Sequence, residues 1–504
     1  MLAHLITAFG QVFEPYVLLV IVLSAIYGLL IGAIPGLSAT MAVALLVPVT
    51  FFMPPVPAVA AMVTSTAMAI FSGDIPGCLL RIPGTPSSAA YADEAYTMTR
   101  NGKSELALGA GLVCSCIGGL FGTVVLIFLA PMLAAFALNF STYEYFWLVL
   151  LGLTCAIFIA SDKPLKGFVS LFIGLIVTCV GMDNPSGFPR FTFGQPELLG
   201  GLSLIPIMVG MFAVSEVLRY SVTSVHKLKQ VDTTVGNVFH GIPRLIAKYP
   251  ASVVRGSILG TVVGALPGAG ADIAAYMAYG ISKKFSREPE KFGTGHVEGI
   301  VEASSANNSA LGGAWIPALV FGIPGDSITA IVIGVLYMKN LNPGPTIFIN
   351  NPVPMYAIFI VFILANLLMI PLGFGAIKIA RRILRVPRNI LMPLILLFCV
   401  VGSYSINNSL FDVGTTLAFG VIAYLMEENG FPLAPTILGI ILGGMLEDNF
   451  ISSMIKSNGH FMAFFDRPIA GTLGVITLAI WIVPFVVKGI RKRRLSARSA
   501  GQHS

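Results

Sequence analysis

The sequence predicts an all-α integral membrane protein with about 11–12 transmembrane helices plus helical hairpins. Three observations support this prediction. Of the 504 residues, 56% are hydrophobic and only 11% are charged, whereas soluble domains carry roughly 25% charged residues. Apolar stretches long enough to span a bilayer recur along the whole chain. Finally, two Pro/Gly motifs each occur twice, which predicts two repeats built from broken helices.

A membrane span needs about 20 mostly apolar residues. No polar segment is long enough to fold as a separate soluble domain, and the longest, residues 221–255, is predicted to be a loop. Candidate spans lie at residues 17–34, 106–136, 145–160, 167–182, 355–376 and 469–487.

The net charge of +7 comes from short Lys/Arg clusters between the apolar stretches. Because such clusters favour the cytoplasmic side, the basic run from Lys488 to Arg498 predicts a cytoplasmic C-terminus. No Lys or Arg precedes Arg81, which predicts an outward-facing N-terminus without a cleaved signal peptide. All six cysteines lie in or beside apolar stretches and are expected to be free packing thiols.

Two motifs occur in the same order in both halves of the chain. GAIPG at residues 32–36 recurs as GALPG at 264–268. Ile75-Pro76, followed by Ile-Pro-Gly at 82–84, recurs as Ile316-Pro317, followed by Ile-Pro-Gly at 323–325. Two matches in register indicate an internal duplication.

The charges of the corresponding loops differ between the two copies. The loop 51–57 is uncharged, whereas its counterpart 282–296 carries four Lys or Arg residues. Arg100 and Lys103 follow the second motif of the first copy, whereas residues 340–354 contain no Lys or Arg. This alternation predicts inverted-topology repeats. The expected organisation is an N-terminal segment 1–15, a first repeat 16–220, a cytoplasmic basic loop 221–250, a second repeat 251–465, a final helix 466–487 and a basic cytoplasmic tail 488–504.

Paired Pro/Gly interruptions in inverted halves point to a transporter site. A half-helix N-terminus suits a carboxylate, and an unwound stretch offers carbonyl oxygens to a cation such as Na⁺. Small polar residues gather at these breaks, although each could instead bond to its own helix or pack between helices. The candidate substrate- and ion-binding residues are Pro35, Gly36, Ser38, Thr40, Ser65, Ser72, Asp74, Gly84, Thr85, Ser87, Ser88, Pro267, Gly268, Gly270, Asp272, Ser304, Asn307, Asn308, Gly325, Asp326, Ser327 and Thr329.

Charged residues near the breaks leave alternatives open. The three aspartates of that set would bind a coupling cation or proton, or would cap half-helices. Glu298 and Glu302 lie one helical turn apart, which favours a solvated or salt-bridged face. Arg81 would attract an anion or anchor the chain at the cytoplasmic surface.

Several chemistries lack their sequence motifs. Gly102-Lys103-Ser104 resembles the end of a phosphate-binding loop, but Thr97 stands where the first glycine is required. There is no HExxH motif, and the six histidines are scattered. The chain therefore has no ATPase motif, and we expect neither enzymatic activity nor a resident metal or cofactor. The one ion expected is a transported Na⁺ or H⁺, as the coupling ion.

Four segments resemble the large membrane subunit of the tripartite tricarboxylate transporters. They are GAIPGLSATMAVALLVP at 32–48, FSGDIPGCLLRIPGTPSSAAYADEAY at 71–96, GALPGAGADIAAYMAYG at 264–280 and IPALVFGIPGDSITA at 316–330. The resemblance extends from about residue 16 to about residue 487. It implies a subunit of a bacterial inner-membrane importer of organic carboxylate anions, tri- or dicarboxylates such as citrate, with secondary transport by cation symport, commonly with sodium. It also implies two partners, a small four-helix membrane subunit and a periplasmic solute-binding protein that delivers the substrate.

Two other functions are weighed against that one. A stand-alone permease or channel for small anions would work without partners. An intramembrane protease using Asp74 and Asp326 would need both carboxylates in one wet cleft, and it has no use for paired inverted breaks. No nucleic-acid partner is expected.

Overall fold

The computed structural model describes residues 2–159, 163–182, 187–222, 236–384 and 388–482. Within these ranges the chain is helical, and the one β-type pairing is an isolated bridge between Gly181 and Arg190. The helices are α1 (Leu2–Val12), α2 (Pro15–Ala33), α3 (Ala39–Phe51), α4 (Pro55–Ser72), α5 (Asp74–Leu80), η1 (Ser87–Ala90), α6 (Ala92–Arg100), α7 (Ser104–Ala137), α8 (Thr142–Ile159), α9 (Pro164–Thr178), η2 (Pro196–Leu198), α10 (Leu204–Val209), η3 (Gly210–Val214), α11 (Ser215–Val222), α12 (Ile242–Lys248), α13 (Pro250–Gly264), α14 (Gly270–Phe285), η4 (Pro289–Lys291), α15 (Val297–Phe321), α16 (Ser327–Met338), α17 (Ile347–Asn350), α18 (Pro352–Ile383), α19 (Arg388–Asn407), α20 (Leu410–Glu428), α21 (Leu433–Lys456) and α22 (Ala463–Asp466).

The predicted all-α membrane fold class is confirmed. In the described residues, 8 helices are long and apolar enough to cross a membrane. Shorter apolar helices include α8, α9 and Pro468–Ile482. Within the predicted basic loop 221–250 the described residues contain α12, so that segment is not all loop. The tail 488–504 and the end of the final helix lie outside the described residues.

Five α-helices of the described residues have a proline at their start. The helices α2, α4, α9, α13 and α18 each have proline in the first turn. Proline suits this position because its fixed φ is compatible with a helix and its missing N–H would have no partner there. Two helical hairpins form, α2–α3 and α13–α14, and each is interrupted at its Pro-Gly motif.

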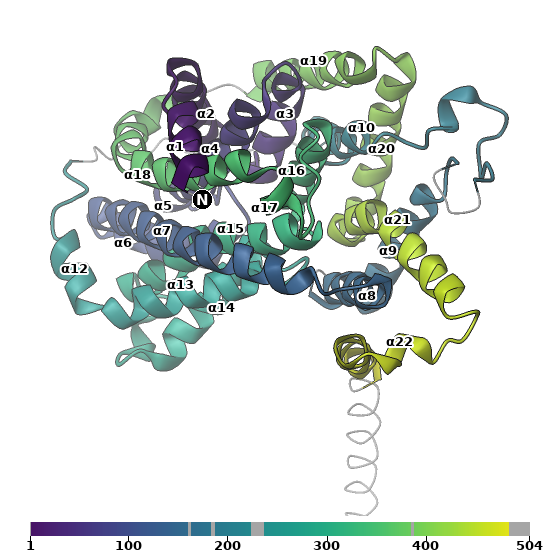
Figure 1. Cartoon of the computed structure of the whole chain (residues 1–504). Coiled ribbons are helices and arrows are strands. Elements are labelled where there is room, and N and C mark those ends of the chain that lie inside the picture. The colour runs from purple at the N-terminus through teal and green to yellow at the C-terminus, as the bar shows by residue number, and fades with distance from the viewer. Residues whose placement is uncertain (1, 160–162, 183–186, 223–235, 385–387, 483–504) are drawn as a thin grey trace, which may run out of the picture.

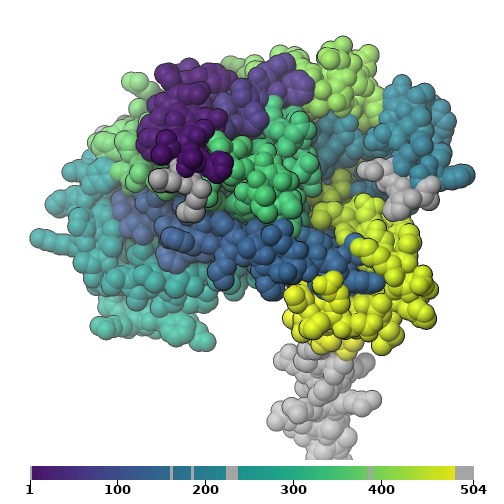
Figure 2. All heavy atoms as spheres, in the orientation of Figure 1, coloured from purple at the N-terminus to yellow at the C-terminus, as the bar shows by residue number. Residues whose placement is uncertain are grey.

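The helix α15 lies at the centre of the molecule and carries several polar residues. Every residue of it from Glu298 to Phe321 is buried. It packs against α7, α13 and α14, and also touches α4 and α16. In Figure 1, α7 crosses the middle of the molecule, with α13 and α14 on one side of it and α2–α4 on the other. In Figure 2 the N-terminal residues (purple) cover one end, where α1 packs on α18.

Glycines bring α2 against α4 in the first half. A Cβ added at Gly28 would lie 2.9 Å from Cα of Ser65, and one at Gly32 would lie 2.8 Å from Cα of Ala69. Both positions would also overlap the carbonyl oxygens of these residues. The small-xxx-small spacing therefore lets the two backbones touch, as is typical of packed membrane helices.

The second half repeats this contact between α13 and α15. A Cβ at Gly260 would lie 2.7 Å from Cα of Ala306, and one at Gly264 would lie 2.8 Å from Cα of Ala310. In each half, a pair of glycines four residues apart thus precedes the Pro-Gly break. Each pair packs on the helix that follows its hairpin. This local correspondence fits a duplication, while the inverted orientation of the copies stays a prediction.

We expect Gly264→Ala to lower the stability of the protein by about 1–3 kcal/mol, because the added methyl group cannot enter the backbone contact with Ala310 without a shift. Thermal unfolding of the detergent-purified protein measures the change as a lower apparent Tm. Gly280→Ala on α14 is the matched control, since nothing lies within 4 Å of its Cβ. Equal unfolding temperatures for the two variants would contradict the packing described.

Candidate functional site

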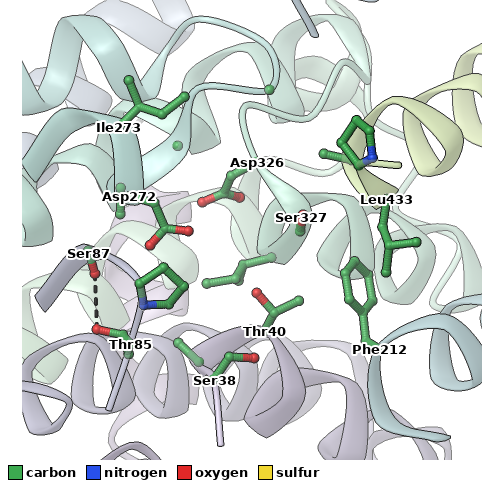
Figure 3. Close-up of a pocket in the computed structure, with 18 of the residues that line it drawn as sticks. Ser38, Thr40, Thr85, Ser87, Phe212, Asp272, Ile273, Asp326, Ser327 and Leu433 are labelled. Atoms are coloured by element: carbon green, nitrogen blue, oxygen red, sulfur yellow. Dashed lines mark hydrogen bonds between the residues drawn. The ribbon is translucent and has the colours of Figure 1, made fainter. Parts of the chain in front are cut away.

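A cavity of about 480 Å³ lies where the helix breaks of both halves meet. The lining comes from the α2–α3, α5–η1, α13–α14 and α15–α16 breaks, together with η3–α11 and the α20–α21 connection. Figure 3 shows side chains from both halves facing one another across this space. Its polar lining includes Ser38, Thr40, Thr85, Ser87, Ser215, Glu216, Arg219, Asp272, Asp326, Ser327 and Glu427.

The hairpin breaks depend on glycines with positive φ. Gly36 has φ 87° and Gly268 has φ 82°, a region that L-residues with a Cβ rarely adopt. Gly268 donates its N–H to the carbonyl of Gly325 at 2.8 Å. A Cβ on Gly270 would lie 2.7 Å from Cβ of Asp326. The tip of the second hairpin is therefore held directly against the α15–α16 break.

The two Ile-Pro-Gly breaks begin in the same way. Arg81 ends α5 with φ 61° and donates its N–H to Gly77, and Gly322 ends α15 with φ 68° and donates to Ala318. Arg81 and Gly322 occupy corresponding positions of the two motifs. Arg81 also pairs with Asp93 at the surface, 2.7 Å apart, and does not line the cavity.

The residues that follow each Ile-Pro-Gly motif exchange equivalent hydrogen bonds. Thr329 donates its N–H to Oδ1 of Asp326 at 2.7 Å, and Asp326 donates its N–H to Oγ1 of Thr329 at 3.0 Å. Ser88 and Thr85 make the same reciprocal pair, with both distances at 3.3 Å. Each pair supplies partners to backbone N–H groups at a helix start. Asp326 and Thr85 thus stand at matching positions on the cavity wall.

Three half-helices begin at the cavity. The first-turn residues of α3, α14 and α16 all line it, and each of these helices has at least 12 residues. Ser38 caps α3 by accepting the N–H of Met41 at 3.1 Å, and Asp326 caps α16. The positive ends of three helix dipoles therefore face one space, which favours a bound anion.

Two carboxylates share that space. Asp272, in the first turn of α14, interacts with Ser87 of the first half and with the charge of Asp326. Figure 3 shows both carboxyl groups on one side of the cavity, facing Ser38 and Thr40 on the other. In the described part of the chain no ion pair joins either aspartate to a basic side chain. The cavity can therefore hold a cation as well as an anion.

Among the described lining residues, the basic side chain is that of Arg219. Arg219 on α11 pairs with Glu216 at 3.2 Å and also with Glu427 on α20. Both glutamates are partly exposed. Arg219 is thus held by two carboxylates in this structure, and the helix N-termini are the main source of positive potential in the cavity.

The structure places the predicted site residues in three groups. Nine of them line the cavity: Ser38, Thr40, Thr85, Ser87, Gly268, Gly270, Asp272, Asp326 and Ser327. A second group builds the breaks behind the lining: Pro35, Gly36, Gly84, Ser88, Pro267, Gly325 and Thr329. A third group lies away from the lining, in the contacts between α4, α5 and α15: Ser65, Ser72, Asp74, Ser304, Asn307 and Asn308.

Members of the third group have different surroundings. Ser65 bonds to a backbone carbonyl of its own helix, whereas the hydroxyl of Ser72 lies 3.3 Å from carbonyls of both its own helix and Gly28 of α2. Asn308 donates to the carbonyl of Ala67 at 3.3 Å. The other three, an aspartate, a serine and an asparagine, form a separate buried cluster.

The glutamates of α15 are salt-bridged or hydrogen-bonded but not solvated. Glu302 is fully buried and pairs with Arg255 of α13. Glu298 accepts from Ser252 at 3.0 Å and from Ser286 at 2.6 Å. Of the two interpretations of this face, the paired one is therefore correct, because α13 and the α14–α15 loop cover it.

Sequence reasoning misses the wall formed by η3, α11 and the α20–α21 connection. Met211 and Phe212 belong to η3, a π-helical turn, and Leu433 follows Pro432. π-Bulges interrupt helices at functional sites more often than elsewhere. No sequence motif marks this turn.

Comparison with known proteins identifies the family of this chain. The model of the tripartite tricarboxylate transporter TctA family matches residues 18–438. The chain belongs to this family. Two relatives from Agrobacterium vitis are similar to this TctA-family chain. One, described as an uncharacterized 52.8 kDa protein in the TAR-I ttuC' 3' region, is 33% identical over 503 residues, covering 98% of both chains.

The other Agrobacterium vitis relative is described as an uncharacterized protein in the TAR-II ttuC' 3' region. It is 33% identical over 230 residues, covering 45% of this chain and 95% of the relative. No solved structure matches. Family membership makes this chain a multi-pass membrane component of a tripartite tricarboxylate transporter, and the matched residues include every helix break that lines the cavity.

Proposed function

We propose that this chain imports organic carboxylate anions, tri- or dicarboxylates such as citrate, by cation-coupled alternating access. The substrate binds in the cavity between the two halves. A periplasmic binding protein delivers it, and a small four-helix membrane subunit completes the transporter. The chain lies in the bacterial inner membrane with its C-terminus in the cytoplasm, consistent with the basic run at its end.

One observation carries this proposal: three half-helix N-termini meet in a cavity of about 480 Å³. Ligand pockets are commonly about 300–1,000 Å³, so a small organic acid fits. Carboxylates bind at helix N-termini because the N–H groups and the dipole both favour negative charge. Two or three carboxylate groups match several N-termini better than one anionic group would.

The charges in the cavity support cation coupling. Asp272 and Asp326 lack a basic partner among the described residues, so an anion entering beside them would be repelled unless cations or protons accompany it. Import into a negative-inside cell also opposes each negative charge by roughly 2.3 kcal/mol per 100 mV. A trianion would then face about 7 kcal/mol at 100 mV, which co-transported Na⁺ or H⁺ would offset.

Alternating access finds support in the matched breaks. Corresponding elements of the two copies meet at the cavity, an arrangement that lets one half rock or slide against the other. The Pro-Gly hairpins are the expected moving parts, and α7 and α18 are the expected scaffold. Cross-links between hairpins and scaffold helices that left uptake intact would contradict this hypothesis.

The proposal is tested by uptake of labelled citrate into vesicles that hold this chain and its small partner. The binding protein and a sodium gradient are added separately and together. We expect uptake only when both are present. Uptake without the binding protein would instead favour a stand-alone permease, and no uptake of citrate, other tricarboxylates or dicarboxylates would overturn the proposal.

Ser327→Trp is expected to block this uptake almost completely, because the indole would fill the cavity between α16 and the opposite wall. Ser457→Trp, next to the end of α21 that lies away from the cavity-lining Leu433, is the matched control and should transport normally. Initial rates at equal protein density in the vesicles compare the two. Equal rates would show that substrate does not pass through this cavity.

A further inference from the structure

A second polar cluster lies inside the protein, outside the cavity lining. Asp74 begins α5, Tyr91 precedes α6, and Ser304 and Asn307 lie one turn apart on α15. Asp74 is 7% exposed, Tyr91 2%, and the other two 0%. These residues come from both halves of the chain, so the cluster exists only in the folded protein.

The hydrogen bonds of the cluster leave acceptors unused. Tyr91 donates its hydroxyl to Oδ1 of Asp74 at 2.6 Å, and Asn307 donates from Nδ2 to the Tyr91 hydroxyl at 3.4 Å. Within the described residues, Oδ2 of Asp74 and Oδ1 of Asn307 have no hydrogen-bond partner, and Ser304 interacts with the Tyr91 hydroxyl. A buried polar oxygen without a partner is costly, so two in one cluster indicate a ligand-binding site.

Oδ2 of Asp74 and Oγ of Ser304 lie near the same point on α7. A Cβ added at Gly111 would lie 3.1 Å from Oδ2 of Asp74 and 3.9 Å from Oγ of Ser304. Glycine at position 111 therefore leaves room beside both oxygens. Asn307 lies on the same face of α15 as Ser304, because residues three apart on a helix are neighbours.

The chemical nature of these side chains indicates which kind of ion the cluster would bind. One carboxylate and neutral hydroxyl and amide oxygens suit a hard cation, whereas His and Cys ligands are absent from the cluster. No ion pair within the described ranges joins Asp74 to a basic side chain. A single buried negative charge is balanced by a single positive one, which favours a monovalent over a divalent ion. We propose that Asp74, Tyr91, Ser304 and Asn307 bind a monovalent cation of the size of Na⁺.

The site is linked to the cavity through one turn of backbone. Gly73, next to Asp74, accepts the N–H of Gly84 at 3.0 Å. A Cβ at Gly73 would lie 2.7 Å from Oγ1 of Thr85, which lines the cavity. Cation binding at Asp74 would therefore fix the α5–η1 break. Only this coupling step rests on the proposed function, and the binding of the cation does not.

Equilibrium binding of ²²Na⁺ to the purified full-length protein tests the site without any substrate. Wild type should bind saturably, with competition by unlabelled Na⁺ and none by choline. Asp74→Asn should weaken the binding at this site by about 10- to 100-fold, the effect of losing one charged contact. Asp93→Asn, an exposed carboxylate two residues from Tyr91, is the matched control and should bind like wild type.

A second variant keeps the test valid if Asp74→Asn does not fold. Gly111→Ala places a methyl group 3.1 Å from the free carboxylate oxygen and should also weaken binding by about tenfold. Wild-type affinity in both folded variants, or no saturable ²²Na⁺ binding by wild type, would overturn the site. If the wild-type protein bound ²²Na⁺ but took up neither citrate nor other tricarboxylates nor dicarboxylates, the proposed function would be rejected and the cation site would stand.

Discussion

Replacing Asp326 by asparagine is expected to reduce gradient-driven carboxylate uptake by about 100-fold, while the fold stays intact. The carboxylate of Asp326 caps α16 and lies near that of Asp272 in the cavity. Asparagine caps a helix about as well as aspartate, so the substitution removes the charge and keeps the cap. A cation or proton that neutralises the cavity then loses one of its two carboxylates.

Two measurements separate this coupling role from a structural one. Substrate binding to the purified variant should depend less on sodium than in the wild type, since the repulsion that sodium relieves is reduced while Asp272 remains. Ser409→Ala removes the cap of α20 at the end away from the cavity-lining Glu427, and should lower stability by about 1 kcal/mol without affecting uptake. Normal sodium-driven accumulation by Asp326→Asn would show that this carboxylate plays no part in coupling.

The sequence predicts part of the cavity wall and misses the rest. Pro35-Gly36 and Pro267-Gly268 mark backbone breaks, because few residues other than glycine adopt the required φ and proline removes a helical hydrogen bond. The two breaks in each copy therefore locate four of the six segments of the wall. The remaining wall comes from η3–α11 and the α20–α21 connection, where a π-turn depends on packing against α20 rather than on a local motif.

Proximity in sequence to a break does not decide where a side chain points. The sequence groups Asp74 with Asp272 and Asp326, because all three flank Pro/Gly breaks in apolar surroundings. In the folded chain, however, Asp74 does not line the cavity. Its carboxylate accepts a hydrogen bond from the hydroxyl of Tyr91 beside α15. The reason is that α4 and α5 form one apolar span from residue 55 to residue 80, which carries Asp74 past the cavity.

Partners distant in sequence decide the surroundings of the buried glutamates, which the sequence alone does not predict. The spacing of Glu298 and Glu302 alone allows a water-facing stripe, yet Arg255 and Ser252 of α13 cover and satisfy these carboxylates. No local pattern pairs α13 with α15, so the choice between solvation and pairing depends on the tertiary fold. Sequence reasoning misses the buried carboxylate of Glu94 for the same reason.

Replacing Glu94 by glutamine is expected to destabilise the contact between the two halves by about 3–5 kcal/mol. Glu94 on α6 is 1% exposed. Its carboxylate accepts the backbone N–H groups of Gly293, Gly295 and His296, the last two at 2.7 and 2.8 Å. Tyr279 of α14 donates its hydroxyl to the same carboxylate at 2.9 Å.

The physical reason is the number of donors that one carboxylate satisfies. Four donors from the second half converge on two oxygens of the first half, and His296 is the N-cap of α15. A glutamine has one acceptor oxygen, and its amide nitrogen would face N–H donors from which it cannot accept a hydrogen bond. Each buried donor left without a partner costs about 1–3 kcal/mol.

Hydrogen exchange resolves this effect locally. In Glu94→Gln the amides of residues 293–296 should exchange faster, and the apparent Tm of the purified protein should fall by several degrees. Glu290→Gln, in the same loop but outside this contact, is the matched control and should change neither. Unchanged exchange at residues 293–296 in Glu94→Gln would mean that the loop is held by its own turns, so that Glu94 does not join the halves.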